Sequence, residues 1–343
     1  MIRVLVTGAN GFVGREATAA LCKAGYEVRA AVRRLEPSVE ALGCETVAVG
    51  DMSAHTDWST ALRGVDLILH LAARAHITRD TCADSLAEFR TINVGGTTSL
   101  AKQAAQYHVR RLVYVSSVKV NGEVTNGRAF TEDDPPDPCD AYGISKWEAE
   151  QALRRIASGA GMETVVIRPV LVYGPRVRAN FLTLLHCVYR GIPLPFAAVR
   201  NRRSMIALRN LIDLLVCALQ HAAAAGETFL VSDGEDHSSA GWVRRIAGAL
   251  GRPARLLPMP VSWIRFGARV VGQQNIVQRV CSSLQVDSSK AVKQLSWHRP
   301  VNVNEELRRT ADWYLGTFGR REGISAWPQL DRHASTDRGR SSR

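Results

Sequence analysis

Short runs of aliphatic and β-branched residues alternate with helix-length amphipathic segments through the first half of the chain. Polar or glycine-rich turns bound these runs, which read IRVLVTG, YEVRAAVRR, CETVAVGD, DLILHLAA, RLVYVSS and METVVIRP. The segments between them, such as residues 11–25 and 85–108, have the length and periodicity of helices. Apolar strands joined by helices run parallel and need cover on both faces. The alternation therefore predicts a doubly wound parallel α/β sheet.

Length and composition set broad limits on this chain. Its 343 residues are enough to bury a large core, and they include no apolar run that could span a membrane and no signal-peptide pattern. We therefore expect a soluble, cytoplasmic protein without a membrane span. The seven cysteines are scattered and lack metal-ligand spacing, which favours reduced thiols and no metal site.

The formal net charge of +12 leaves several kinds of partner open. A basic chain can bind nucleic acid, a membrane surface or an anionic small substrate, and charge alone does not decide between them. The sequence has no nucleic-acid recognition motif and no interleaving of aromatic with basic residues. Nucleic acid is therefore the least favoured partner.

The stretch TGANGFVG lies at the first turn from strand to helix and contains Gly8, Gly11 and Gly14. The first glycine permits a sharp turn, the second lets a pyrophosphate approach backbone N–H groups at the helix N-terminus, and the third allows the helix to pack closely on the strand. This turn predicts NAD(P) binding by a sheet of the Rossmann type. Its other candidate cofactor contacts are Asn10, Phe12 and Val13.

Arg33 and Arg34 follow the second strand, where an acidic residue would hold the 2′-hydroxyl of an NAD ribose. Arginines there would instead meet a 2′-phosphate, so NADP(H) is favoured and NAD(H) stays open. The alternative is that both are solvated loop charges. After the third strand, Asp51 and Met52 occupy the place where a carboxylate could hold the adenine amino group, although a simple turn role for Asp51 is almost as well supported.

Tyr142 and Lys146 stand one helical turn apart in DAYGISKWEAE. The lysine ammonium and a positively charged nicotinamide would stabilise the phenolate and draw its pKa, ordinarily about 10, toward neutrality. The tyrosine could then move the proton that accompanies hydride transfer, and the lysine could hydrogen-bond the nicotinamide ribose. The serine pair that ends RLVYVSS would supply a hydroxyl from the neighbouring strand to hold the same substrate oxygen.

These motifs, in this order, resemble the extended short-chain dehydrogenase/reductase family, in its nucleotide-sugar branch of NAD-dependent epimerases and dehydratases. The resemblance runs from residue 1 to about residue 315. VSSVKVNG implies Ser117 as the catalytic hydroxyl beside Ser116, and Ser117, Tyr142 and Lys146 form the implied catalytic set. HLAA, which begins at His70, resembles the segment that passes the cofactor phosphates.

Two further segments of the resemblance concern the cofactor. NVGGT implies Asn93 as a brace for the active site, and RPVLVYGP resembles the segment that lines the nicotinamide, with Arg168 structural and Tyr173 nearby. The remaining implied cofactor contacts are Leu71, Ala72, Ala73, Asn93, Ser116, Tyr142, Lys146 and Val172.

The second half of the chain resembles the part of the family that holds a nucleotide sugar. ANF implies that Asn180 meets the diphosphate, and NRRSMIAL implies that Arg203 clamps it, as a planar guanidinium can do with two oxygens. The alternatives are that Asn180 caps the following helix and that Arg202 replaces Arg203. Ser117 and Lys119 complete the implied substrate contacts.

The residues after the catalytic serine bear on the reaction. Nucleotide-sugar 4,6-dehydratases resemble one another in carrying an acid and a carboxylate base directly after the catalytic serine or threonine, where they eliminate water. This chain has Val118 and Lys119 at these two positions. The wider pattern resembles a subgroup labelled UDP-glucose 4-epimerase-like, which includes 4-ketoreductases that make UDP-N-acetylquinovosamine for surface polysaccharide. Because Arg33 and Arg34 favour NADPH, we expect reduction of a UDP-4-keto-6-deoxy-N-acetylhexosamine. The alternatives are a UDP-glucose or UDP-N-acetylglucosamine 4-epimerase with tightly held NAD, and a non-catalytic dinucleotide-sensing protein.

The alternation of strands and helices loosens in the second half of the chain. We expect residues 1–174 to form the NAD(P)-binding domain, with some later strands returning to its sheet, and residues 175–316 to form mainly a smaller substrate-binding lobe. Residues 317–343 have the composition of a basic, disordered tail. The resemblance also implies a homodimer through a four-helix bundle, for which residues 85–108 and 140–159 are the candidates.

Overall fold

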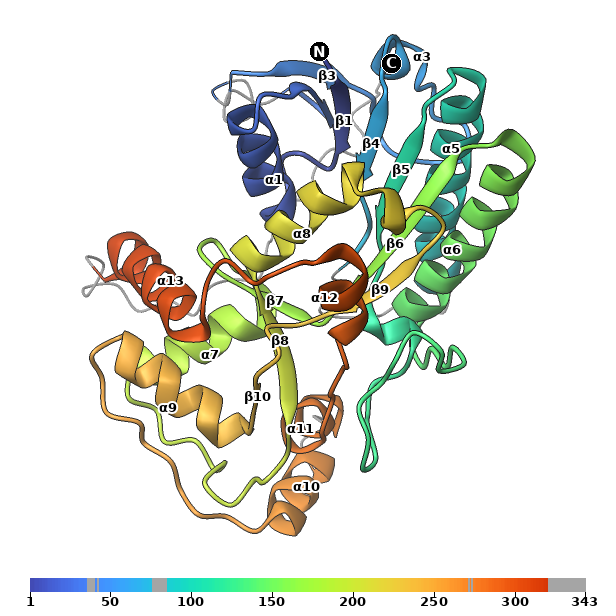
Figure 1. Cartoon of the computed structure of the whole chain (residues 1–343). Coiled ribbons are helices and arrows are strands. Elements are labelled where there is room, and N and C mark those ends of the chain that lie inside the picture. Colours follow the sequence, from blue (N-terminus) through green and yellow to red (C-terminus); the bar gives the residue numbers. More distant parts are fainter. Residues whose placement is uncertain (36–40, 42, 76–84, 271, 273, 320–343) are drawn as a thin grey trace, which may run out of the picture.

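The structure contains the alternating strands and helices that the sequence predicts (Figure 1). The structure, a computed structural model, describes residues 1–35, 41, 43–75, 85–270, 272 and 274–319. The strands are β1 Arg3–Thr7, β2 Glu27–Val32, β3 Glu45–Ala48, β4 Leu67–His70, β5 Arg111–Val115, β6 Glu163–Pro169, β7 Leu171–Tyr173, β8 Arg203–Ala207, β9 Thr228–Val231 and β10 Asp236–His237. The α-helices are α1 Phe12–Lys23, α3 Ser59–Leu62, α4 Ser85–Phe89, α5 Thr97–Gln106, α6 Ala141–Ala160, α7 Ala179–Tyr189, α8 Leu208–Gln220, α9 Ser239–Ala249, α10 Val261–Val270, α11 Gln274–Cys281, α12 Ser289–Leu295 and α13 Val303–Phe318. The π-helix η1 Arg90–Gly96 and the 3-10 turns η2 Val118–Val120 and η3 Ala222–Ala224 complete the described elements.

The larger sheet has seven strands in the order β3-β2-β1-β4-β5-β6-β9. Every neighbouring pair in it is parallel. Its first six strands in chain order come from the six apolar runs of the sequence, and β9 joins the edge beside β6. The predicted doubly wound parallel sheet is confirmed.

Helices cover both faces of this sheet, as parallel strands require. Side chains of β1 alternate between the two sides, so that Val4 and Val6 belong to the core shared with α1 and α8. Leu5 points the other way, into the core shared with α5 and α6. Figure 1 shows these two helix layers on opposite sides of the strands. The carboxyl ends of the strands then meet at one edge, where ligands of such sheets bind.

A second, smaller sheet has the strand order β10-β8-β7. Strand β7 pairs with β8 in parallel and β10 pairs with β8 in the antiparallel direction. Helices α7, α9 and α13 pack around it in a core of their own, in the lower part of Figure 1. The sequence did not predict these strands individually, because the alternation of apolar runs and helices loosens in this half of the chain. The domain boundaries at residues 174 and 316 stay predictions.

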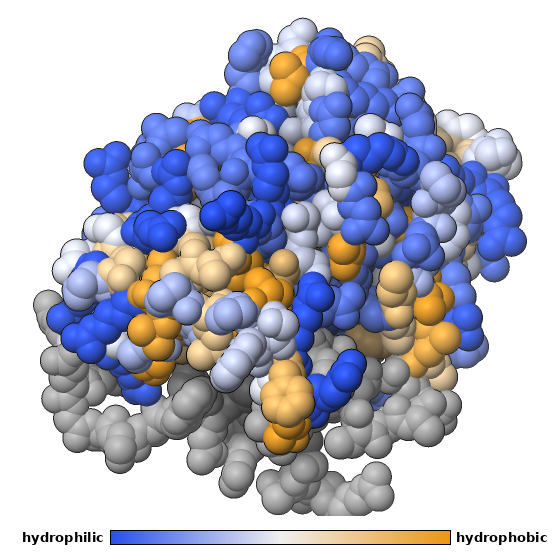
Figure 2. All heavy atoms as spheres, turned by 90° about the horizontal axis from the view of Figure 1, so that it is seen from below, coloured by the Kyte–Doolittle hydropathy of each residue, from blue (hydrophilic) through white to orange (hydrophobic). Residues whose placement is uncertain are grey.

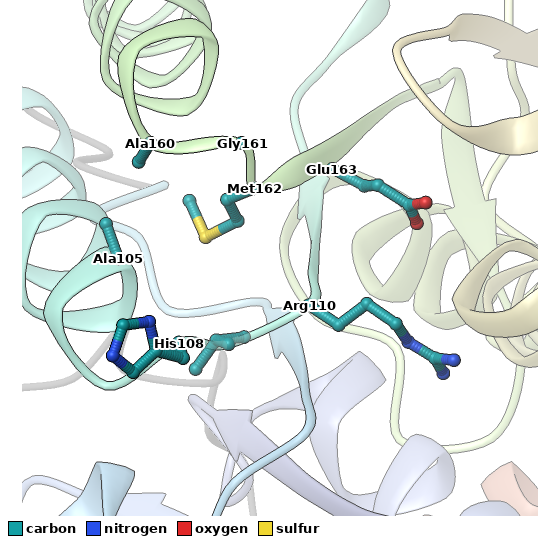
Figure 3. A pocket seen from close by; sticks show the side chains of 8 residues that line it. Ala105, His108, Arg110, Ala160, Gly161, Met162 and Glu163 are labelled. Carbon is teal, nitrogen blue, oxygen red and sulfur yellow. The ribbon is translucent and has the colours of Figure 1, made fainter.

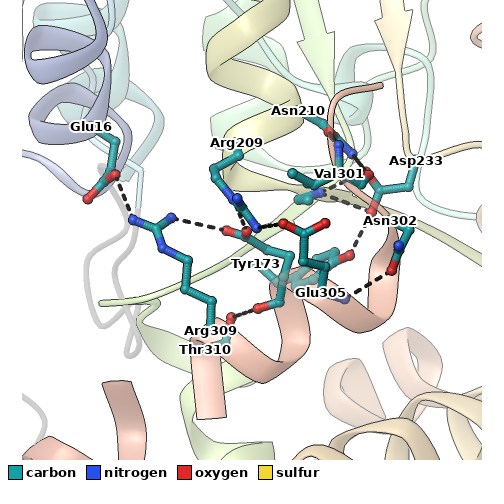
Figure 4. A network of polar contacts seen from close by, with 12 residues as sticks. Glu16, Tyr173, Arg209, Asn210, Asp233, Val301, Asn302, Glu305, Arg309 and Thr310 are labelled. Carbon is teal, nitrogen blue, oxygen red and sulfur yellow. Dashed lines mark hydrogen bonds and ion pairs between the residues drawn. The ribbon is translucent and has the colours of Figure 1, made fainter. Parts of the chain in front are cut away.

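A network of buried polar groups connects the smaller sheet with α8 (Figure 4). Asp233 accepts hydrogen bonds from the Tyr173 hydroxyl and the Asn210 amide, each at 2.7 Å. Tyr173 is fully buried and stacks on Phe181. The hydroxyl of Tyr173 is thus committed to this network, and the prediction that Tyr173 lies near the nicotinamide stays a prediction.

Helix α13 contributes ion pairs to the same region. Arg209 of α8 pairs with Glu306 at 2.7 Å and with Glu305 at 2.8 Å, and Arg309 lies 3.4 Å from Glu16 of α1. Burial raises the pKa of the Glu306 carboxyl, and the guanidinium of Arg209 opposes that rise. These contacts hold the last described helix against the larger sheet's own helices.

Several broad predictions concern the chain as a whole. Within the described ranges, no helix is long and apolar enough to cross a membrane, and no group of three or more potential ligands could hold a metal ion. Six cysteines have free thiols, at positions 22, 44, 139, 187, 217 and 281. Cys82 and residues 320–343, most of the predicted tail, lie outside the described residues.

Candidate active site

The glycine turn has the geometry that its sequence predicts. Gly8 has a φ of +67°, and a Cβ at this position would lie 2.8 Å from the Ala72 nitrogen. The Gly11 amide donates to the Gly8 carbonyl at 2.9 Å, and α1 begins at the next residue. A Cβ on Gly14 would lie 2.1 Å from the Gly8 oxygen, so only glycine permits this approach of helix and turn.

The end of β4 lies directly against this turn. The Thr7 hydroxyl accepts hydrogen bonds from the amides of Leu71 and Ala72, at 3.2 and 3.1 Å. These two residues and Ala73 are partly exposed, as are Asn10, Phe12 and Val13 on the turn. The structure thus brings all these predicted cofactor contacts to one edge of the sheet.

Arg33 and Asp51 meet at the ends of β2 and β3. Their charged groups lie 3.5 Å apart, and their side chains are 70% and 83% exposed. Arg34 is exposed beside them. Met52 is partly buried and packs on η1, since a Cβ on Gly96 would lie 2.3 Å from its Cγ. Arg33 therefore forms an ion pair with Asp51. The sequence had assigned Arg33 to a 2′-phosphate and Asp51 to the adenine, and it did not predict this pair.

The three predicted catalytic residues come together where β5 ends and α6 begins. Asp140 caps α6 by accepting a hydrogen bond from the Gly143 amide at 2.7 Å, which fixes the first turn that carries Tyr142. Ser117 lies close enough to the Tyr142 phenol to lower its pKa. One turn further, the buried Lys146 ammonium donates to the Val115 carbonyl at 2.7 Å.

The pKa values of this group follow from burial. Burial raises the pKa of Tyr142 to about 12, with the Asp140 charge acting in the same direction and Ser117 opposing it. Burial also lowers the pKa of Lys146 to about 7, against the attraction of Glu150. The prediction that Lys146 draws the tyrosine pKa toward neutrality is therefore wrong for the protein groups alone. Among these groups, Tyr142 is a neutral proton donor at neutral pH.

Ser116 does not join the catalytic group through its side chain. Its hydroxyl donates to the buried Glu150, which Arg168 holds with bonds of 3.0 and 2.6 Å. Arg168 also donates to Asn121 at 3.0 Å. This buried pair explains the structural role implied for Arg168, because removal of one partner from such a pair typically costs about 3–5 kcal/mol.

Asn93 braces the site from within the π-helix η1. Its amide oxygen accepts from the Arg74 amide at 2.9 Å, and its amide nitrogen donates to the Ser145 hydroxyl at 2.9 Å. It thereby connects the loop after β4 with α6. The sequence predicted one continuous helix over residues 85–108, whereas the structure has α4, this π-helix and α5 in succession. Short π segments are frequent at functional sites.

Lys119 is the substrate candidate closest to the catalytic group in sequence. Its ammonium pairs with Glu123 at 2.7 Å and also with Asp140. Neither carboxylate was predicted as a site residue, although Glu123 stands four positions after Lys119. Val118 is buried, so the two positions after Ser117 offer no acid and base for dehydration.

Arg203 lies on β8 and is half-buried, whereas its neighbour Arg202 is exposed. It donates to the Ser282 carbonyl at 3.2 Å. Burial lowers the pKa of its guanidinium to about 10, the charge of Arg279 adds to this effect, and Glu123 opposes it. Arg279, on α11, is a second cation near the same place that sequence reasoning missed, because only the fold brings residues 203 and 279 together.

The remaining predicted residues lie at the start of α7 and on β7. Asn180 is the exposed second residue of α7, and the N-cap position belongs to Arg178. The alternative that Asn180 caps this helix is therefore wrong. Val172, on β7, is partly exposed. Backbone strain marks this loop, since Arg176 and Ala179 have positive φ angles of 67° and 52°.

Two hollows differ in their relation to this site. One of about 460 Å³ is lined partly by Glu123, the partner of Lys119, together with residues of the loop 121–139 and Gln278. The other, about 230 Å³, lies where β5 and β6 begin and therefore at the opposite edge of the sheet (Figure 3). Its lining residues include His108 and Glu163, neither of which contacts the catalytic group. Only the first of these two hollows therefore lies near the predicted catalytic residues, at the edge where the strands end.

Comparison with known proteins extends over nearly the whole chain. Residues 4–232 match the NAD dependent epimerase/dehydratase family. A UDP-glucose 4-epimerase from Vibrio cholerae is 42% identical over 315 residues, which cover 91% of this chain and 95% of that protein. An N-acetyl-alpha-D-glucosaminyl-diphospho-ditrans,octacis-undecaprenol 4-epimerase from Escherichia coli O157:H7 is 28% identical, with coverage of 90% and 94%.

Solved structures share the fold. The crystal structure of UDP-glucuronic acid 4-epimerase from Bacillus cereus, in complex with UDP-glucuronic acid and NAD, has a TM-score of 0.75 to this chain. The two are 22% identical, and the match covers 92% of this chain and 100% of the other.

Proposed function

The chain belongs to the NAD-dependent epimerase/dehydratase family, and we propose that it inverts C4 of a UDP-sugar, as a 4-epimerase. The observation that carries this proposal is the meeting of Ser117, Tyr142 and Lys146 at the sheet edge that also bears the glycine turn. A hydroxyl donor, a phenol and an ammonium at that place suit reversible oxidation of a sugar alcohol. The 42% identical relative, named a UDP-glucose 4-epimerase, supports C4 and the UDP group.

The glycine turn fits a nicotinamide dinucleotide, because its lack of side chains leaves backbone amides at the N-terminus of α1 open to a pyrophosphate. When bound, this cofactor accepts and returns a hydride, and the positive charge of its oxidised ring lowers the pKa of a nearby phenol. We assign Gly8, Gly11 and Gly14 to the pyrophosphate and Lys146 to the nicotinamide ribose.

Proton transfer at the sugar falls to the protein. Tyr142 removes the proton from O4 as the alcohol becomes a ketone and gives it back when the alcohol re-forms on the other face. The Ser117 hydroxyl, which lies beside the Tyr142 phenol, holds O4 in line with it. Between the two transfers the 4-keto sugar must turn over within the site, while its diphosphate stays anchored.

Two arginines suit that anchor. Arg203 and Arg279 lie close enough for their charges to interact, and the charge of Glu123 offsets that of Arg279 at Arg203. Guanidinium groups bind phosphate oxygens through paired N–H donors. Asn180, exposed at the start of α7, is the proposed third contact. The predicted homodimer stays a prediction.

The pair Arg33–Arg34 favours a second candidate, the NADPH-dependent reduction of a UDP-4-keto-6-deoxy-N-acetylhexosamine. Both side chains are exposed at the end of β2, where a 2′-phosphate would lie. In that reaction Tyr142 donates its proton to O4, and the cofactor must exchange after each turnover. A purely sensing protein is the weakest alternative, because the tyrosine and lysine are both present and in place.

The experiment compares two incubations of the purified protein. With UDP-glucose or UDP-N-acetylglucosamine and NAD, an epimerase yields the C4 epimer without net change in reduced cofactor. With the 4-keto-6-deoxy sugar and NADPH, a reductase consumes cofactor in proportion to product. Epimer formation that disappears in Tyr142→Phe supports the main proposal, whereas NADPH consumption without epimer formation supports the second. Inactivity in both incubations contradicts both.

A further inference from the structure

Helix α10 exposes an apolar ridge formed by Trp263, Phe266 and Val270. Each of the three side chains is 72% exposed, and among the large hydrophobic residues that the structure describes only Met1 is more exposed. Intervals of three and four residues place the ridge along one side of the helix. Trp263 and Val270 are seven residues apart, so the ridge is about 10 Å long.

The helix itself is firmly attached to the protein. Ile264 and Ala268, four residues apart on another side of α10, are buried. The ridge is therefore not the helix's attachment to the core. Figure 1 places α10 at the lower end of the molecule, and the view from that side shows hydrophobic side chains in groups among hydrophilic ones (Figure 2). Clustered exposed apolar residues of this size mark interaction surfaces.

The segment of the chain that carries the ridge has charges of one sign. The 50 residues from His237 to Val286 contain seven arginines and neither aspartate nor glutamate. Arg265 and Arg269 are exposed on α10 itself, next to the ridge and one helical turn apart. The arginines of this segment complement a partner with negative charges on its surface. The exposed aromatic side chains of the ridge complement an apolar layer beneath those charges.

We propose that the apolar ridge docks on a bilayer surface that contains anionic lipids. Tryptophan and phenylalanine enter the boundary between headgroups and acyl chains, and arginines beside them meet lipid phosphates. A second copy of this chain fits less well, because a two-fold symmetric contact would place the same arginines against each other. The contact is peripheral, since no described helix could span the membrane.

The test measures co-sedimentation of the full chain with lipid vesicles. One vesicle contains phosphatidylcholine alone, and the other contains phosphatidylcholine with phosphatidylglycerol. We expect binding to the anionic vesicle that weakens as salt is raised. The double variant Trp263→Ser/Phe266→Ser should lower the partition coefficient roughly tenfold or more, because it removes the side chains that enter the lipid. Tyr107→Ser, at an exposed aromatic residue of another element, is the matched control and should bind like the original chain.

A second pair of variants tests the charges. Arg265→Glu/Arg269→Glu should abolish the preference for anionic vesicles. The control Lys23→Glu/Arg63→Glu changes the net charge by the same amount at two exposed residues, one on α1 and one in the loop after α3. This control should retain most of the preference for anionic vesicles. Every variant keeps residues 320–343, so differences report α10 alone. Absence of binding to either vesicle overturns the proposal, as does binding that the ridge variant leaves intact. Dimers of the original chain that the ridge variant loses, without vesicle binding, would assign the ridge to a second copy instead.

Discussion

The Lys146 ammonium donates a hydrogen bond to the Val115 carbonyl, 2.7 Å away. This bond joins α6 to the last residue of β5, two positions before Ser117. The lysine is 2% exposed and its nitrogen lies 4.2 Å from the centre of the Tyr114 ring. A cation so enclosed keeps the two catalytic elements together, and its burial gives it a measurable influence on stability.

Lys146 should make stability depend on pH above neutrality. Its ammonium loses the proton near pH 7 in the folded protein and near pH 10.5 when unfolded. Between these values the unfolded chain binds more protons, so the free energy of unfolding rises with pH. From pH 7 to 8.5 the gain should reach at most ~2 kcal/mol. Denaturant titrations at both pH values should show this gain, and Lys146→Met should lack it. If the free energy of unfolding rose equally with pH in both chains, Lys146 would not be the group that titrates.

Tyr142→Phe should lower turnover by roughly 10²–10⁴-fold, because it removes the proton that general acid–base catalysis supplies. Its ring would stay in place, so dinucleotide affinity should remain within a few-fold. Turnover is followed with the UDP-sugar assays above, and affinity by fluorescence quenching. Tyr107→Phe, at an exposed residue, is the control. Undiminished turnover in the Tyr142 variant would refute the proton-transfer role.

Arg33→Asp tests the cofactor preference. If Arg33 meets a 2′-phosphate, the variant places a second carboxylate beside Asp51 and should weaken NADPH binding at least roughly tenfold. NADH binding should change little. The measurement is a pair of binding titrations, with Arg63→Asp as an exposed control. Unchanged affinity for both dinucleotides would leave Arg33 as a surface charge paired with Asp51.

Two glycine substitutions should act in opposite directions. Gly14→Ala would drive a Cβ to 2.1 Å from the Gly8 oxygen, and neither backbone can give way easily. It should destabilise the protein by about 1–3 kcal/mol and weaken dinucleotide binding. Gly159→Ala meets no atom within 4 Å on α6 and should stabilise it by about 0.5–1 kcal/mol. Thermal unfolding of both variants decides, and a tolerated Gly14→Ala would speak against the tight turn.

His70 should make the protein sensitive to acid. Burial lowers its pKa to about 3, with the charge of Lys146 acting in the same direction. Below pH 6.5 the unfolded chain binds a proton that the folded protein does not, so the free energy of unfolding falls, by up to ~2 kcal/mol at pH 5. His70→Gln should show a shallower fall, and the exposed His55→Gln should not. Identical profiles for all three chains would exclude this origin of acid sensitivity.

Local spacing explains what the sequence could predict. The glycine turn, Ser117 and the pair Tyr142–Lys146 each depend on residues close in sequence, so the structure places them as expected, whereas the Ser116 side chain turns to Glu150 instead. Six of the seven strands of the larger sheet were predictable for the same reason, because each is a continuous apolar run, whereas β9 was not predicted individually. Asn93 was predicted as a brace through resemblance, although the π-helix that carries it was not.

The misses concern contacts between distant segments. Asp140 lies 21 positions after Lys119, and Arg279 lies 76 positions after Arg203, so no local pattern connects them. The predicted lowering of the Tyr142 pKa by Lys146 is wrong among the protein groups for a related reason. Sequence shows which charges stand nearby along a helix, but the extent of burial follows only from packing, and burial is the larger effect here.

The path of the chain between the two sheets restricts how they can move. After β6 in the larger sheet the chain forms β7 and β8 in the smaller one, returns as β9, and leaves again for β10. At least three segments of the described chain therefore cross between the sheets, so one sheet cannot swing away from the other about a single joint. Admission and release of a ligand at the shared edge should proceed by loop displacement and slight sliding of packed helices, with both sheets unfolding as one unit.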